Sequence, residues 1–194
     1  MARAGITVER LVQTAADMAD EIGFDNVTMS ALARSFGVKD ASLYSHVKNL
    51  TELRARVALL AAREQADRVV TAVAGRAGKD ALVAFADAYR QYAHEHPGRY
   101  AATQIQVDPA LAAEAPGSTR GGELVYAMLQ GYGLSEPDVT DAVRLLRSTF
   151  HGFILLESGG GFGHPRSVQA SWERAVEALH ILLRNWPPER GHGA

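Results

Sequence analysis

The 194-residue sequence predicts an all-α protein with a small N-terminal helical domain and a larger C-terminal helical domain. Apolar residues recur three and four positions apart through most of the chain, a spacing that places them on one face of a helix. Glycine and proline interrupt this pattern where helices would end. No stretch alternates apolar and polar residues as a half-buried strand does. We therefore expect helices and no sheet.

The first two helices are recognised by their caps. Apolar residues between positions 8 and 22 follow the helical period, with Thr7 as the N-cap and Gly23 as the stop. After a short link, Thr28 can cap a second helix that ends at Gly37. Both helices fall within the first forty or so residues, so this region is dense in short elements.

Two more helices follow in the first third of the chain. Ser42 to Val47 fit a short third helix, and Asn49 can cap a long fourth helix that runs from Leu50 towards Gly75. Further on, the apolar period and the prolines predict helices at residues 80–95, 98–106, 118–130, 137–157 and 167–186. Residues 108–117 show no clear period, and we expect a loop there with a helical turn at most.

The composition is that of an ordinary globular protein. Hydrophobic residues make up 47% and charged residues 22%, which is compatible with a buried core. The lack of cysteine excludes disulfides, thiolate catalysis and cysteine-based metal sites. No apolar run approaches the roughly 20 residues that span a bilayer, and no secretory signal begins the chain, so we expect a cytoplasmic protein. The net charge of −2 means that any DNA contact must be local.

Residues 28–48, TMSALARSFGVKDASLYSHVK, have the spacing of a helix-turn-helix. Ala33 is small where two helices must cross closely, and Gly37 supplies the left-handed backbone of a sharp turn. A small shared core would be formed by Leu32, Phe36, Val38, Leu43 and Val47. Because any three short helices around a glycine turn show such a spacing, the spacing alone leaves a purely structural bundle open.

The second helix of a helix-turn-helix pair enters the major groove of DNA. The outward face of that helix would carry Lys39, Asp40, Ala41, Ser42, Tyr44 and Ser45, with His46 and Lys48 at its edge. These residues are the candidate contacts to bases and phosphates.

The sequence matches more than this spacing, because residues 7–53 resemble the TetR family. The resemblance rests on the threonine at the start of the second helix, on LARSFGV and on LYSHV. It implies that Tyr44 and His46 contact phosphates or support the recognition helix, and that Thr28 is a cap and a phosphate contact. Leu50 stands where many members carry a phosphate-binding lysine, and Lys48 is the candidate substitute. The resemblance thus implies a three-helix DNA-binding domain at residues 1–52.

This predicted domain is not basic. Before residue 49, five Lys and Arg residues stand against six Asp and Glu residues. We therefore expect DNA binding to rely on backbone N–H groups at helix N-termini and on the avidity of a dimer. Its dependence on salt should be modest.

Residues 53–187 are predicted to form a ligand-binding and dimerisation domain, followed by a disordered tail at 188–194. The run LLRSTFHGFILLESGGGFG, residues 145–163, resembles the C-terminal domain of regulators named for a Trp-His-Gly triplet, with Phe150 in place of the tryptophan. The family implies a dimer seam of two helices from each subunit. Its candidate residues are Val143, Leu146, Phe153, Ile154, Trp172, Val176, Leu179 and Leu183. The alternative is that both apolar stripes are core within one subunit.

Candidate pocket residues are tyrosines, a methionine and a few polar groups, because such side chains line small-molecule sites. They are Tyr89, Tyr92, Tyr100, Gln104, Tyr126, Met128, Arg147, Phe150 and His151. Taken one at a time, a residue of any of these types is more often part of a half-buried core than of a ligand pocket. His151 could contact a ligand or be a buried, hydrogen-bonded imidazole, and we favour the second interpretation. We expect no cofactor and no metal, since His94 and His96 have no identifiable third ligand.

Together these features predict a dimeric transcriptional repressor that binds a palindromic operator and is released by a small molecule. The rival hypothesis is a small helical ligand carrier or enzyme that does not bind DNA. The sequence has no nucleophile elbow and no HExxH pair, and the carboxylates Asp87 and Glu157 fit no pairing pattern that we recognise. We therefore predict that the protein is not an enzyme.

Overall fold

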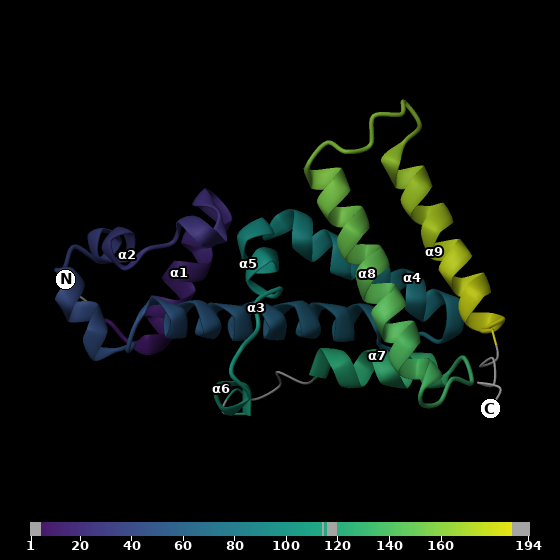
Figure 1. Cartoon of the computed structure of the whole chain (residues 1–194), viewed down its shortest axis with the longest axis horizontal. Coiled ribbons are helices and arrows are strands. Elements are labelled where there is room, and N and C mark those ends of the chain that lie inside the picture. Colours follow the sequence, from purple (N-terminus) through teal and green to yellow (C-terminus); the bar gives the residue numbers. More distant parts are fainter. Residues whose placement is uncertain (1–4, 114, 116–119, 188–194) are drawn as a thin grey trace, which may run out of the picture. The chain divides into compact units, whose positions relative to one another are not determined.

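The computed structural model describes residues 5–113, 115 and 120–187, and every regular element in this part of the chain is a helix (Figure 1). In chain order the elements are α1 (Val8–Ile22), η1 (Phe24–Asn26), α2 (Met29–Phe36), η2 (Asp40–Ser45), α3 (Leu50–Val73), α4 (Gly78–Glu95), α5 (Pro97–Ala102), α6 (Pro109–Ala113), α7 (Arg120–Gln130), α8 (Asp138–Ser158) and α9 (Val168–Arg184). The two η elements are 3₁₀ helices. The all-α prediction is confirmed. Among these helices, none has the length and apolar character to cross a membrane.

The first helices begin and end at the predicted cap residues. The Thr7 side chain accepts a hydrogen bond from the N–H of Arg10 at 3.2 Å, and the Thr28 side chain accepts one from Ala31 at 3.2 Å. Each bond satisfies one of the four N–H groups that a helix leaves unpaired at its start. Gly37 ends α2 with φ of +66°, a left-handed conformation that costs glycine no steric strain.

Two elements differ from the sequence prediction. The third helix is a 3₁₀ helix that begins at Asp40, two residues before Ser42. Helix α5 ends at Ala102 rather than near residue 106, and there the Thr103 hydroxyl donates to the carbonyl of Tyr100 at 2.7 Å. The helical turn expected in the loop after residue 108 is present as the five-residue helix α6.

The chain forms two compact units. The first unit combines residues 1–68 with residues 91–121, and the second combines residues 69–90 with residues 122–194. This division differs from the predicted boundary between residues 52 and 53. The physical reason is that α3 is one continuous helix that contributes to both units, as does α4. The tail predicted at 188–194 lies outside the described residues.

The core of the first unit joins α1, α2, η2 and the start of α3. Leu11, Leu32, Leu43 and Leu53 have no exposed surface, and Ala33 is buried with them. Full burial of one such leucine side chain contributes roughly 1.5–3 kcal/mol. This core therefore fixes the two helices of the predicted helix-turn-helix against each other.

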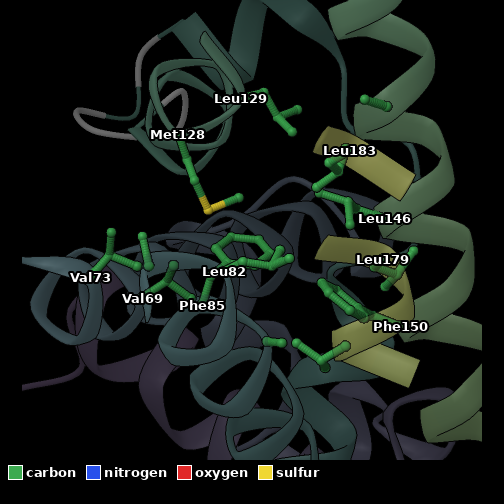
Figure 2. Close-up of a cluster of buried hydrophobic side chains, with 14 of the residues drawn as sticks. Val69, Val73, Leu82, Phe85, Met128, Leu129, Leu146, Phe150, Leu179 and Leu183 are labelled. Atoms are coloured by element: carbon green, nitrogen blue, oxygen red, sulfur yellow. The ribbon is translucent and has the colours of Figure 1, made fainter. Parts of the chain in front are cut away.

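The core of the second unit is larger and gathers side chains from the end of α3 and from α4, α7, α8 and α9 (Figure 2). Helices α8 and α9 pack against each other and are joined at one end by the loop of residues 159–167 (Figure 1). Phe150 of α8 and Trp172 of α9 are both fully buried, with their ring centroids 5.3 Å apart. This aromatic pair lies within one subunit.

Candidate functional site

The 3₁₀ helix η2 exposes most of its residues and buries Leu43. Its exposed residues are Asp40, Ala41, Ser42, Tyr44 and Ser45, and Tyr44 exposes 51% of its surface. Lys39 just before η2 and Lys48 beyond its end are exposed as well. Two predicted contacts lie elsewhere: Thr28 is exposed at the start of α2, and His46 is half-buried after η2. Most of the predicted DNA contacts are therefore exposed on or beside η2.

The link between α2 and η2 is held by both backbone and side chain. The N–H of Val38 donates to the carbonyl of Ala33 at 3.0 Å across the glycine turn. The hydroxyl of Ser30 on α2 donates a short hydrogen bond to the carboxylate of Asp40 in η2. This bond fixes the direction of the Asp40 side chain relative to the preceding helix.

A reciprocal cap orders the chain where η2 joins α3. The Asn49 side chain accepts a bond from the N–H of Glu52 at 2.8 Å, and the Glu52 carboxylate accepts one from the N–H of Lys48 at 2.7 Å. Glu52 also pairs with Arg56 at 2.7 Å. The Lys48 N–H first, and then Arg56, hold the pKa of Glu52 below its usual value. The prediction named Asn49 alone, although the Asn-x-x-Glu spacing signals this cap.

The exposed face of η2 carries little positive charge. Lys39 and Lys48 are exposed, while Asp40 contributes a carboxylate beside them. Leu50, which replaces the lysine implied by the family resemblance, is half-buried and packs against the core of the first unit. Its side chain therefore serves packing.

Arg99 joins α5 to α1 and α3 within the first unit. Its guanidinium forms ion pairs with Asp17 and Asp20 of α1 and with Glu64 of α3, the last at 3.2 Å. Its backbone N–H donates to Asp20 at 2.8 Å, and Nδ1 of His96 lies 3.0 Å from the same carboxylate. Arg99 is only 6% exposed. We call these five residues the Arg99 cluster; it ties the first helix of the unit to residues 91–102.

Burial and neighbouring charges set the protonation states of Arg99 and Tyr92. Burial lowers the pKa of Arg99, but attraction to the three surrounding carboxylates outweighs burial and raises the pKa. The hydroxyl of Tyr92 donates to the carbonyl of Ala61 at 3.1 Å and to Glu64 at 3.2 Å. Burial, and next the charge of Glu64, raise the pKa of Tyr92. Arg99 therefore stays charged and Tyr92 neutral at physiological pH.

Gly98 allows α5 to approach the backbone of α1. A Cβ atom at this position would lie 2.0 Å from the carbonyl oxygen of Ala19 and 2.5 Å from the backbone nitrogen of Asp20. Both distances are far inside van der Waals contact, and neither backbone atom can rotate away as a flexible side chain could. Only glycine fits this contact without separating the two helices.

The predicted pocket residues divide between the two units. Tyr92, Tyr100 and Gln104 belong to the first unit. Tyr92 and Tyr100 are buried there, and the side chain of Gln104 donates to the hydroxyl of Thr103 at 2.7 Å. The remaining predicted pocket residues belong to the second unit, so the set does not form one cluster within either unit.

In the second unit the predicted pocket residues have different surroundings. Phe150 and Met128 are core residues, while Tyr126 and Arg147 are exposed. Tyr89 is half-buried with its ring centroid 5.9 Å from that of Phe150. His151 is half-buried, and burial first, then the charge of Arg147, lower its pKa. This environment favours a neutral imidazole, and the choice between a ligand contact and a buried imidazole stays a prediction.

Arg90 is a central polar residue of the second unit that the sequence pattern did not single out. Its guanidinium binds both carboxylate oxygens of Glu157, at 2.8 and 2.5 Å, and lies 5.0 Å from the ring centroid of Trp172. The Trp172 indole N–H donates to Asp87 at 2.8 Å. Asp87 and Glu157, for which we recognised no pattern, therefore both take part in contacts between α4 and the last two helices.

The predicted dimer residues lie mainly inside the second unit. Leu146, Ile154, Trp172, Val176, Leu179 and Leu183 are buried by their own chain, and Val143 and Phe153 are half-buried against the same core. A side chain already covered within its subunit offers almost no surface to a partner. The helical spacing identified a buried face correctly, but that face packs within the subunit.

Other apolar residues of the same helices are exposed. Leu155 and Leu156 on α8 and Ile181 and Leu182 on α9 each leave between 39% and 54% of their surface uncovered. Leu155 and Leu156 lie near the end of α8 that leads into α9, whereas Ile181 and Leu182 lie near the far end of α9 (Figure 1). We call these four exposed residues together the α8–α9 patch. Exposed apolar surface beyond isolated side chains is typical of surfaces that bind other proteins.

Two family models match complementary parts of the chain. The model described as "Bacterial regulatory proteins, tetR family" matches residues 11–57, and "Tetracyclin repressor-like, C-terminal domain" matches residues 82–179. The chain belongs to the TetR family. As a member of this family it is a DNA-binding transcriptional regulator, which confirms the class predicted from LARSFGV and LYSHV. The narrower likeness to the Trp-His-Gly subgroup stays a prediction.

Two similar proteins from different bacteria are named as HTH-type transcriptional regulators. The uncharacterized HTH-type transcriptional regulator Rv0681 of Mycobacterium tuberculosis is 39% identical over 162 residues, which cover 81% of this chain and 72% of that protein. The uncharacterized HTH-type regulator YobS of Bacillus subtilis is 32% identical over 94% of this chain and 96% of its own length. Both relatives are named as regulators rather than as enzymes or carriers.

Solved structures share the TetR fold over nearly the whole chain. A protein of unknown function from Rhodococcus sp. RHA1 superposes with a TM-score of 0.74 at 20% identity, covering 93% of this chain and 96% of that one. Apo ActR from Streptomyces coelicolor superposes with a TM-score of 0.73 at 20% identity, covering 94% of this chain and 96% of ActR. BioQ from Mycobacterium smegmatis superposes with a TM-score of 0.70 at 21% identity, covering 94% of this chain and all of BioQ.

Proposed function

We propose that this TetR-family regulator is a repressor that binds a palindromic operator as a homodimer and leaves it when a small molecule binds. The observation that carries the proposal is the exposed face of η2, which presents polar side chains and Tyr44 on an element that buries Leu43. A rigid helix with one exposed polar face is the form in which proteins read the major groove. Because the target would be chromosomal DNA, we place the protein in the cytoplasm.

The proposed contacts divide into two kinds. Ser42, Ala41 and Asp40 have short side chains on η2 and would meet base edges. Tyr44, Lys48 and Thr28, with His46 and Lys39 beside them, would meet phosphates and set the register of the protein on DNA. With only two exposed lysines on this face, few counterions are released, so we propose a shallow dependence of affinity on salt.

We propose that the α8–α9 patch is the dimer surface. Leu155, Leu156, Ile181 and Leu182 are its anchors, in place of the buried residues named from the sequence. Burying apolar surface against a second copy contributes about 25 cal/mol for each Å² removed from water. A two-fold dimer would present two η2 elements about 34–36 Å apart, one turn of DNA or a multiple of it.

Repression and release by a ligand are supported by relatives. The HTH-type transcriptional repressor DrrR1 of Streptomyces coeruleorubidus is 27% identical over 142 residues, 73% of this chain and half of that protein. ActR of Streptomyces coelicolor has been solved with actinorhodin and with (S)-DNPA, at 20% and 22% identity to this chain. We propose that an effector of this chain enters the second unit beside Tyr89 and Phe150, where an aromatic cluster borders exposed residues.

The proposal is tested by selecting bound sequences from a random duplex pool with the purified full-length protein. We expect a palindrome to be enriched, and we expect Tyr44→Ala and Lys48→Ala to lose binding to it at several salt concentrations. Lys79→Ala is the matched control, because it removes an equally charged lysine that pairs with Glu177 in the second unit. The same selection would be repeated with protein that has been unfolded and refolded to remove any bound ligand. If that protein also enriches no sequence, the result would favour a ligand carrier instead.

A further inference from the structure

Asp40 is the one carboxylate on the exposed face of η2, and it has no cationic partner among the described residues. Its Oδ2 atom accepts the bond from Ser30, and within the described chain no donor reaches its other oxygen, Oδ1. An unpaired carboxylate facing DNA repels phosphates, so it weakens binding to every sequence. We therefore expect Asp40 to make a favourable contact with DNA that offsets this repulsion.

We propose that Asp40 reads a cytosine in the operator, by accepting a hydrogen bond from the cytosine amino group in the major groove. The proposal rests on the proposed function and adds the identity of one base. A carboxylate can only accept hydrogen bonds, and the major groove offers donors only on cytosine N4 and adenine N6. The adenine amino group lies between the acceptors N7 and thymine O4, which repel a carboxylate, whereas cytosine N4 has an acceptor on one side alone.

The bond from Ser30 makes this contact directional. A free aspartate on a surface samples several rotamers and must lose that freedom on binding. The Ser30 hydroxyl ties the Oδ2 atom of the exposed Asp40 side chain to α2, and Oδ1 accepts no hydrogen bond within the described chain. Asp40 is thus oriented before DNA arrives, which lowers the entropic cost of the contact.

The experiment compares selections made with the natural protein and with Asp40→Asn. Asparagine keeps an oxygen for Ser30, so the group that it leaves for DNA is the NH2, which donates where the carboxylate oxygen accepted. In the major groove this donor pairs with the acceptors O6 and N7 of guanine, so we expect one position of each half-site to change from cytosine to guanine while the other positions stay the same. In direct binding assays, the preference for cytosine over guanine in the natural protein should be roughly 5- to 150-fold per half-site, and Asp40→Asn should reverse it.

Two controls separate base reading from charge and from folding. Asp25→Asn removes an equal charge from an exposed residue of η1 and should leave every base preference unchanged. Ser30→Ala keeps the carboxylate but removes its tether, so the cytosine preference should become weaker without changing to another base. Each comparison uses the ratio of one variant's affinities for two operator sequences, so a change that weakens binding to both sequences equally cancels. Thermal unfolding of each variant verifies its fold.

The possible outcomes distinguish this proposal from the proposed function. If a palindrome is enriched but Asp40→Asn leaves every base preference as it was, Asp40 only links η2 to α2 and the cytosine proposal is wrong. The same conclusion follows if the natural palindrome contains no cytosine at any position that Asp40→Asn alters. If no palindrome is enriched at all, the proposed function itself fails.

Discussion

Arg99 of α5 contacts Asp20 of α1 twice, through its guanidinium and through its backbone N–H. Asp17 and Glu64 complete the surroundings, so that three carboxylates from α1 and α3 enclose one buried cation. Separating α5 from α1 would leave the buried Arg99 guanidinium and the largely buried Asp20 carboxylate without each other in a poorly solvated place, which is costly. The position of α1 in the helix-turn-helix unit therefore depends on a residue outside the predicted DNA-binding domain.

Replacing Arg99 should lower stability strongly. Arg99→Gln removes the cation and leaves three carboxylates facing one another, so we expect the free energy of unfolding to fall by about 3–5 kcal/mol. Urea denaturation measures the loss. Arg68→Gln is the matched control, since Arg68 pairs with Glu95 at 2.6 Å on the surface and such pairs contribute about 0–1 kcal/mol. Equal losses in the two variants would show that the Arg99 cluster is no more important than a surface pair.

Gly98→Ala should separate α5 from α1. The added methyl group meets the Ala19 carbonyl oxygen at 2.0 Å, so the backbones must move apart, and we expect a loss of about 1–3 kcal/mol or more. Gly122→Ala in α7 is the control, because nothing lies within 4 Å of its Cβ position, and it should stabilise the helix by up to about 1 kcal/mol. Thermal unfolding compares the two, and an unchanged melting temperature for Gly98→Ala would contradict the close contact.

The cap formed by Glu52 should make stability depend on pH in acid. The folded-state pKa of Glu52 lies below its usual value of about 4.3, so its contribution is fully present above that pH and is lost as the pH falls through the folded-state pKa. Glu52→Gln should therefore be less stable than the natural protein near neutrality, and the difference should shrink below about pH 4. Denaturation series at several pH values measure it, and a difference independent of pH would refute the role of the charge.

The α8–α9 patch should hold the dimer together. Leu155→Glu and Ile181→Glu place charges in the proposed apolar contact, so we expect each to convert the dimer to monomer and to abolish tight operator binding. Ile22→Glu alters a similarly exposed aliphatic residue of α1 and should leave the oligomeric state unchanged. Sedimentation velocity distinguishes these states. A natural protein that sediments as a monomer, or patch variants that remain dimeric, would assign the dimer surface elsewhere.

Local signals made the helix-turn-helix predictable. Thr28 and Gly37 determine the ends of α2 through bonds to residues three or four positions away, and the fully buried Leu32 and Leu43 follow from the spacing of the motif. These features depend on neighbouring residues, so the sequence displays them directly. The change from an α-helix to a 3₁₀ helix at η2 was not predictable, since both forms bury Leu43.

Contacts between distant segments were not predictable in the same way. Arg99 meets residues of α1 that lie 79 and 82 positions earlier, and no local pattern marks such a pairing. The period of α8 and α9 showed that one face of each helix is buried, but it could not show whether a partner subunit or the same chain covers that face. Leu146 and Leu183 therefore appeared as dimer residues although they are core.

Changing the distance between the two halves of the selected operator tests the dimeric repressor most directly. Affinity would be measured for the natural duplex, for one with about five base pairs inserted between the half-sites, and for one with about ten inserted, that is, half a turn and a full turn of DNA. We predict that the half-turn insertion reduces binding to the level of unrelated DNA, because one η2 element then faces the wrong side of the duplex. Equal affinity for the natural and half-turn duplexes would show that each subunit binds alone, and would contradict the account.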